Sequence, residues 1–247
     1  MQKKNKRAAG IFFLVCAAIL GTAVLWQSTG YISADRTDQE IIDTYTTEGN
    51  GKIDDEFLID WEALLAECPS VTGWVRMDSG ANYPVLYSGD NEYYLHRDLY
   101  GNYSVNGAIF MDGANDPGWE DRNTVIYGHN MNNGSMFGKN KKYKGKSYAE
   151  EHPYFYIYTP EGCGHYRIFA AMDTNDGDEP YTTVFNDMDA FYAYLDRMEQ
   201  LSTYHLENID LGEAEKIVTL STCTNYGKDR FVTQGYLETF VEDEGQK

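Results

Sequence analysis

Cys223 closes the stretch TLSTC at the end of an apolar, β-branched run, and Arg230 follows shortly afterwards. A thiol attacks a carbonyl as the thiolate, and a cysteine pKa of about 8.5 makes that form a minority at neutral pH. An imidazole can accept the thiol proton and later return it to a leaving amine. A guanidinium keeps its charge and can stabilise the oxyanion formed in between. Acyl transfer at Cys223 would therefore need a histidine and an arginine beside it.

His129 is the best candidate for the histidine. It ends a strand-like run after Gly128 and opens an Asn/Gly-rich loop, and functional groups often lie in such loops. His165, inside a predicted strand, is the second candidate. The other three histidines are His96 in a probable loop, His152 before a proline and His205 at a predicted helix end.

The residues alone leave two interpretations of Cys223 open. Free cysteines are among the most buried residue types, so Cys223 could be a core thiol. Strand alternation instead puts it on a mixed face with Thr219 and Ser221, opposite Val218 and Leu220, and that face suits a pocket. Arg230 in turn could form a surface salt bridge or lie beside the thiol.

The cysteines argue against a disulfide framework and a metal site. Cys16 lies in an apolar N-terminal segment, which leaves Cys68, Cys163 and Cys223, an odd number, so at least one of these is unpaired within the chain. No C-x-x-C or H-x-x-x-H spacing occurs, and we expect neither a metal nor another cofactor.

The charge of the chain makes nucleic acid an improbable partner. The formal net charge is −19 over 247 residues, although the first seven residues carry only basic charges. An acidic body of this kind repels phosphate-rich partners.

The N-terminus predicts a membrane anchor. Residues 1–7 form a basic tail, and residues 8–26 carry no charge over a length that would cross a bilayer. The basic flank predicts a cytoplasmic N-terminus and an extracellular catalytic domain in a single-pass membrane protein. The alternative is a cleaved signal peptide, against which the length of the apolar run argues.

The rest of the chain divides into a polar stalk over residues 27–52, part of it helical around Asp38–Tyr45, and one domain over residues 53–247. Eight short strand-like runs predict a mainly-β domain closed into a barrel, because open sheets would leave edges. A helix is expected around Phe57–Leu65, a short one at Lys146–Glu151, and a long one before the cysteine-bearing strand. The eight runs are GWVRM, YPVLYS, GAIFMD, NTVIYGH, YFYIYT, HYRIFAAM, KIVTLSTC and FVTQGYLETF, and TPEGCG between the fifth and sixth predicts a hairpin turn.

Several of these segments together resemble the sortases. TLSTC at a strand end, an arginine opening the next strand and IYGHN upstream are similar to that family. GAIFMD, NTVIYGHNM, SMFG and EEHPYFYIYT resemble class B sortases in particular. The resemblance runs in consistent order from about Trp61 to Val241, and it implies an eight-stranded sortase-like β-barrel.

The resemblance also implies a function. Cys223 would be the nucleophile, His129 the acid and base, and Arg230 the group that stabilises the oxyanion. The enzyme would cleave a C-terminal sorting motif of a secreted protein after threonine and transfer the protein to an amine of peptidoglycan or its lipid-linked precursor. Four further residues match regions that line the peptide groove in class B sortases: Asn91, Leu95, Tyr181 and Ser221.

Three alternatives remain at this point. The same residues could serve a cell-surface cysteine protease with water as the acceptor. A pilin-polymerising sortase would use a lysine of another protein subunit, and an adhesion module would have a merely structural Cys223. The spacing of Cys223 and Arg230 is short for class B, which predicts a tight turn between them.

Overall fold

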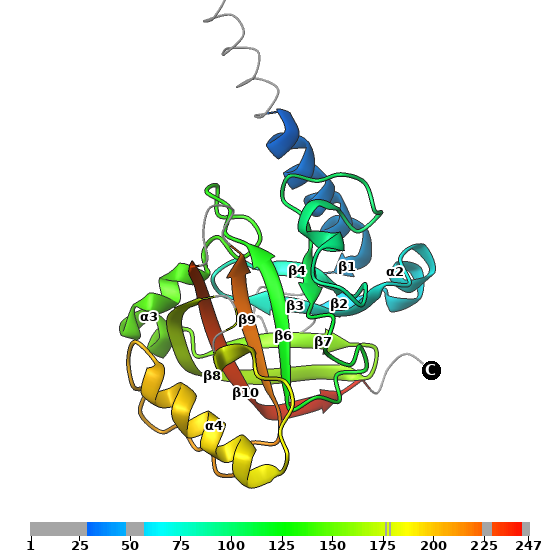
Figure 1. The fold of residues 1–247 in the computed structure, drawn as a ribbon. Coiled ribbons are helices and arrows are strands. Elements are labelled where there is room, and N and C mark those ends of the chain that lie inside the picture. Colours follow the sequence, from blue (N-terminus) through cyan, green and yellow to red (C-terminus); the bar gives the residue numbers. More distant parts are fainter. Residues whose placement is uncertain (1–28, 48–56, 176, 178, 224–228, 244–247) are drawn as a thin grey trace, which may run out of the picture.

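The fold is seen in a computed structural model that describes residues 29–47, 57–175, 177, 179–223 and 229–243. Eight strands close into a barrel in the order β10-β8-β7-β3-β4-β5-β6-β9 (Figure 1). Two neighbouring pairs, β4 with β5 and β6 with β9, are parallel, and the others are antiparallel. The strands are β3 (Val71–Met77), β4 (Asn82–Leu86), β5 (Ile109–Met111), β6 (Asn123–His129), β7 (Tyr154–Thr159), β8 (Gly162–Asn175), β9 (Ile217–Cys223) and β10 (Asp229–Glu242).

The barrel confirms the predicted fold class. Each of the eight runs expected from the sequence overlaps one of these strands, and the barrel closes because β9 pairs with both β10 and β6. The predicted hairpin turn joins β7 to β8, where Thr159 pairs with Gly162 across a two-residue connection.

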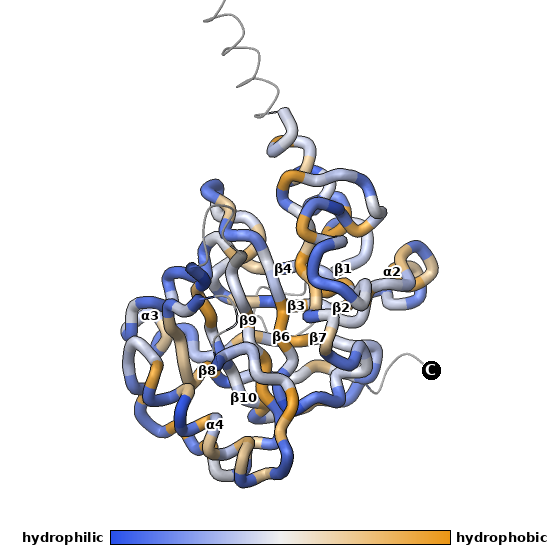
Figure 2. Tube along the Cα trace, viewed as in Figure 1, coloured by the Kyte–Doolittle hydropathy of each residue, from blue (hydrophilic) through white to orange (hydrophobic). Residues whose placement is uncertain are grey.

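The helices lie outside the barrel, and polar segments dominate the outer surface (Figures 1 and 2). The long predicted helix is present before β9, and its N-terminus is capped by Asp187, whose side chain accepts a hydrogen bond from Ala190 N at 2.8 Å. The helical elements are α2 (Trp61–Glu67), α3 (Lys146–Glu151), α4 (Met188–Leu201) and the 3₁₀ turns η1 (Tyr93–His96), η2 (Asn140–Lys144) and η3 (Glu179–Tyr181).

The helix expected around Phe57–Leu65 starts later than predicted. Leu58 and Ile59 instead form β2 (Leu58–Ile59), which pairs with β1 (Thr46–Thr47). The helix begins at Trp61 because the Asp60 side chain accepts a hydrogen bond from Ala63 N at 2.9 Å and caps it.

Residues 29–45 form a helix that packs against the barrel near β4, in blue in Figure 1. Ala34, Ile41 and Tyr45 are buried in this contact, at 8%, 3% and 8% exposure. The helix is longer than the segment around Asp38–Tyr45 expected from the sequence. The domain boundaries at residues 52 and 53 remain predictions.

The membrane location predicted from the sequence is not supported. The proposed anchor over residues 8–26 lies outside the described residues. In the part of the chain that is described, no helix is long and apolar enough to cross a membrane. The helix over residues 29–45, for example, carries charged groups along its length, including Asp35, Arg36 and Glu40.

Strand alternation sorts the residues of β9 between two cores. Val218 and Leu220 pack in the main cluster with barrel-lining residues such as Phe155. Ile217 packs in a second cluster with Phe191 of α4. The residues of β9 that alternate with Val218 and Leu220 therefore belong to the outer face of the barrel, as the sequence pattern predicted.

A buried amide joins β6, β9 and the segment that contains η3. Asn123, fully buried at the start of β6, donates through Nδ2 to the carbonyl of Thr182 at 2.8 Å and to that of Pro180 at 3.2 Å. Its Oδ1 accepts a hydrogen bond from Thr219 Oγ1 at 2.8 Å. The η3 segment is thus fixed to the strand pair that leads to Cys223.

We expect Asn123→Ala to lower the free energy of unfolding by about 2–4 kcal/mol, because it leaves the buried Thr219 hydroxyl without its acceptor and removes a hydrogen bond from each of the Pro180 and Thr182 carbonyls. Urea denaturation of the variant and of the exposed control Asn132→Ala measures the difference. Equal midpoints in the two variants would contradict the structural role assigned to Asn123.

Candidate active site

The parallel pairing of β6 with β9 brings His129 and Cys223 together. The two residues are partners in the ladder, and each is the last residue of its strand. Neighbouring strands lie about 4.8 Å apart. Since parallel strands end at the same edge of a sheet, the positions predicted for the acid/base and the nucleophile are adjacent.

Arg230 lies on the other side of β9 from His129. It is in β10, half-buried, and its neighbour Phe231 pairs with Thr222, which precedes Cys223. His129, Cys223 and Arg230 therefore occupy the ends of three adjacent strands. The turn expected between Cys223 and Arg230 lies outside the described residues.

The His129 ring is held by a backbone carbonyl. Its Nε2 lies 2.8 Å from the carbonyl oxygen of Leu95, and the His129 residue is buried at 5% exposure. A carbonyl can only accept, so Nε2 carries a hydrogen and donates it. In the neutral ring, Nδ1 is then the nitrogen with a free lone pair, and the hydrogen bond selects this tautomer.

The surroundings of His129 favour its neutral form. Burial lowers the pKa of His129 below its ordinary value of 6.5, while the hydrogen bond to Leu95 opposes this. The charges of His96 and Arg230 lower it further. The His96 ring lies 6.0 Å from the His129 ring, a neighbour that the sequence did not single out.

Two of the four residues predicted to bind peptide meet directly. The Tyr181 hydroxyl, from η3, lies 2.9 Å from Ser221 Oγ on β9. The Tyr181 ring stacks on Tyr127, with centroids 6.1 Å apart. Tyr127 lies two residues before His129 and pairs with Ser221 in the ladder, so these three side chains gather on one face beside the strand ends.

Asn91 joins this group through a carboxylate. Asn91 Nδ2 donates to Asp112 Oδ2 at 3.0 Å, and the Tyr127 hydroxyl donates to the same oxygen at 2.7 Å. Leu95 is half-buried, and its carbonyl reaches His129. The sequence analysis missed Tyr127 and Asp112. The position of Tyr127, on the same face of its strand as His129, was the available signal.

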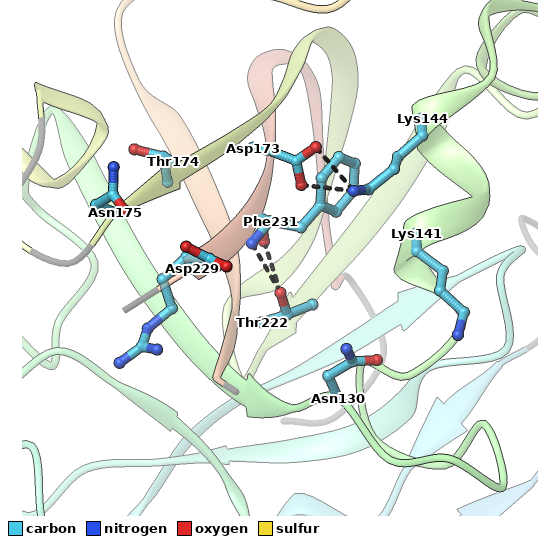
Figure 3. A pocket seen from close by; sticks show the side chains of 10 residues that line it. Asn130, Lys141, Lys144, Asp173, Thr174, Asn175, Thr222, Asp229 and Phe231 are labelled. Carbon is cyan, nitrogen blue, oxygen red and sulfur yellow. Dashed lines mark hydrogen bonds and ion pairs between the residues drawn. The ribbon is translucent and has the colours of Figure 1, made fainter. Parts of the chain in front are cut away.

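A cavity of about 510 Å³ opens beside the strand ends. Thr222 and Phe231 lie in the middle of the lining residues in Figure 3, and Lys144 of η2 reaches Asp173 of β8, with Nζ 2.8 Å from Oδ2. Asn130, next to His129, and Arg230 also line it. The cavity thus adjoins the row of candidate residues and carries charges of both signs.

Metal ligation has no candidate group among the described residues. There, no three His, Cys, Asp or Glu side chains gather so that they could hold an ion. The centroids of the His96 and His129 rings lie 6.0 Å apart beside the strand ends, and the His129 Nε2 is already hydrogen-bonded.

Comparison with known proteins identifies the family. The sortase domain family matches residues 77–238. Sortase B of Listeria monocytogenes is 37% identical over 203 residues, which cover 80% of this chain and 80% of that protein. Sortase B of Staphylococcus aureus is 29% identical over 66% of this chain and 67% of its own length.

Solved structures agree with this result. A crystal structure of sortase B from Bacillus anthracis superposes with a TM-score of 0.74 at 28% identity, covering 87% of this chain and 99% of that one. The barrel fold, the match to the sortase domain family and the similarity to the two sortase B proteins all indicate the same family. The chain belongs to the sortase family, in class B, and is a transpeptidase.

Proposed function

We propose that residues 53–247 form the catalytic domain and that Cys223 cleaves a sorting motif after a threonine. The thiolate sulfur adds to the threonine carbonyl, and the amide C–N bond then breaks to give a thioacyl-enzyme. An amine of peptidoglycan or its precursor attacks the thioester, and the C–S bond breaks. A new amide forms, and the thiolate is regenerated.

His129 moves the protons of both half-reactions. It receives the thiol proton at Nδ1, the nitrogen that the Leu95 carbonyl leaves free, and donates it to the departing amine. In the second half-reaction it accepts a proton from the attacking amine and returns it to the released Cys223 thiolate, which restores the thiol and the neutral ring. The lowered pKa of His129 suits this role, because the ring gives up its proton readily.

Arg230 stabilises the negative charge that develops on the carbonyl oxygen. Asn91, Leu95, Tyr181 and Ser221 line the groove for the sorting peptide, with Tyr127 and Asp112 supporting them from beneath. The acceptor amine enters from the cavity at the end of the barrel, which adjoins Asn130 and Arg230.

The observation that carries this proposal is the ladder pairing of His129 with Cys223 at the ends of two parallel strands. Acyl transfer requires a proton acceptor for the thiol and a group that stabilises the oxyanion. The buried His129 ring with its fixed tautomer supports the first role, and Arg230 on the next strand supports the second. Family membership supports the transpeptidase chemistry but leaves the motif and the acceptor open.

Incubation with a panel of sorting-motif peptides and a wall-like amine tests this function by mass spectrometry. We expect an acyl adduct on the native enzyme and an amidated peptide product, and neither with Cys223→Ala, which has no nucleophile. Full turnover by Cys223→Ala would refute the proposal. Hydrolysed peptide alone, despite added amine, would favour a protease, and a product formed only with a lysine-bearing protein would favour a pilin polymerase.

The acid limb of kcat/KM against pH should lie below pH 6.5, because burial lowers the pKa of His129 and the neutral ring persists to lower pH. Replacing the neighbouring imidazole in His96→Gln removes a charge that lowers this pKa, so the acid limb should move to higher pH. His205→Gln, at an exposed position, serves as the control. An unchanged limb in His96→Gln would argue against His129 as the titrating group.

Arg230→Lys should reduce kcat by about 10²- to 10³-fold, because a compact ammonium cannot reproduce the fork of donors around a developing oxyanion. KM for the peptide should change much less. Steady-state kinetics of this variant beside Arg122→Lys measures the effect, and equal kcat values in both would remove Arg230 from the mechanism.

A further inference from the structure

The helix over residues 29–45 lies against two loops that flank His129. One is the segment from η1 to β5, which supplies the Leu95 carbonyl, and the other is the loop that follows His129 after β6. The contact is tightly filled on the side of the helix that faces these loops, where the cavity lined by Ile41, Leu99 and Met136 has a volume of only about 10 Å³. The more open cavity, about 690 Å³, lies farther along the helix beside Gln39 and Asn82.

Asp35 on this helix binds an amide from each loop. Asn106 Nδ2, in the first loop, donates to Asp35 Oδ1 at 2.8 Å, and Asn133 Nδ2, in the second, donates to Asp35 Oδ2 at 2.6 Å. Asn106 is fully buried and also donates to Asp38 Oδ2 at 3.2 Å. One carboxylate therefore joins two loops that are separate in sequence.

The Asn106 loop packs closely around the Leu95 carbonyl, which accepts the hydrogen bond from His129. Ser104 N donates to the His96 carbonyl at 3.0 Å, and Ala108 N donates to that of Tyr94 at 3.0 Å. Gly107 has φ +60°, and a Cβ there would lie 2.5 Å from the Leu95 oxygen. The loop thus fits the Leu95 carbonyl so closely that moving Asn106 would move the acceptor of the His129 hydrogen bond.

The Asn133 loop is hydrogen-bonded to the backbone of His129. Phe137 N donates to the His129 carbonyl at 3.0 Å, and Asn130 and Met136 form a β-bridge across the loop. The tip of this loop, where Asn133 accepts hydrogen bonds from Ser135, is the part that reaches Asp35.

We propose that Asp35, acting through Asn106 and Asn133, is a positioning residue for the catalytic histidine, and that the helix over residues 29–45, although it precedes the proposed catalytic domain, supports the site from outside it. The inference rests on the proposed role of His129. Asp35 touches neither substrate nor the reacting atoms; it fixes the ring by holding the two loops that bind it.

The part of the contact around Asp38 and Asn106 is shielded from water, whereas the hydrogen bond from Asn133 to Asp35 is exposed. Burial raises the pKa of Asp38 to about 7, with Asp35 and Asp98 adding repulsion of like charge, while the hydrogen bond from Asn106 opposes the shift. A carboxyl group with water around it would not be perturbed to this extent. The hydrogen bonds around Asp38 and Asn106 therefore act where water competes little.

Asp35→Ala in the full chain tests the inference through two readouts. We expect kcat to fall about tenfold with KM for the peptide changed less than twofold, since the loosened ring is misplaced and the groove is intact. By NMR titration, the pKa of the His129 ring should rise toward 6.5, because burial is the largest influence that lowers it and the loss of burial outweighs the loss of the Leu95 hydrogen bond, which raises it. Glu40→Ala, an exposed position on the same helix, is the control.

Asn133→Ala removes only the link to the loop after His129 and, at an exposed position, should leave the fold intact. We expect it to shift the His129 pKa in the same direction as Asp35→Ala, whereas its neighbour Asn132→Ala should not. If the kcat and ring pKa of Asp35→Ala and Asn133→Ala match those of their controls, the inference is wrong. The ring titration needs no activity, so failure of the proposed function would appear separately, as a native enzyme without an acyl adduct.

Discussion

The parallel pairing of β6 with β9 is the constraint on which the rest of the structure depends. Antiparallel neighbours can be joined by a short hairpin, but parallel neighbours need a crossover. Here the crossover from His129 to Ile217 contains η2, α3, β7, β8, η3 and α4. The two residues proposed for acyl transfer therefore meet only when most of the barrel has formed, so the site is a product of the whole fold and of no local motif.

The same pairing explains why a glycine, Gly128, precedes His129. A Cβ on Gly128 would lie 2.4 Å from Ile109 Cδ1 and 2.6 Å from the Phe137 ring, so only glycine fits there. The strand can thus approach β5 and the following loop closely. Burial favours the neutral ring, and the Leu95 carbonyl determines which nitrogen is free.

The sequence predicted the strands and helices better than it predicted which segments contact each other. All eight barrel strands, α3 and α4 followed from period and composition, and so did the alternation of β9 between its two faces. The pattern around Phe57–Leu65 predicted a helix that begins too early. Leu58 and Ile59 instead pair with β1, a contact with no local signal. Tyr127 and Asp112 were missed for the same reason, since their role arises from Asn91 and Tyr181, which are distant in sequence. The family resemblance, not periodicity, identified Arg230.

The negative net charge of the chain explains why amides, and not cations, bind several carboxylates around the candidate site. With 20 basic against 39 acidic residues, few cations are available to pair with buried carboxylates. Asparagine amides take their place: Asn91 binds Asp112, and Asn106 and Asn133 bind Asp35. A hydrogen bond from a neutral amide to a carboxylate is charge-assisted but has no long-range Coulomb attraction between ions, so added salt weakens it less than a surface ion pair. In this acidic protein, amides therefore hold the segments beside the candidate histidine without additional ion pairs.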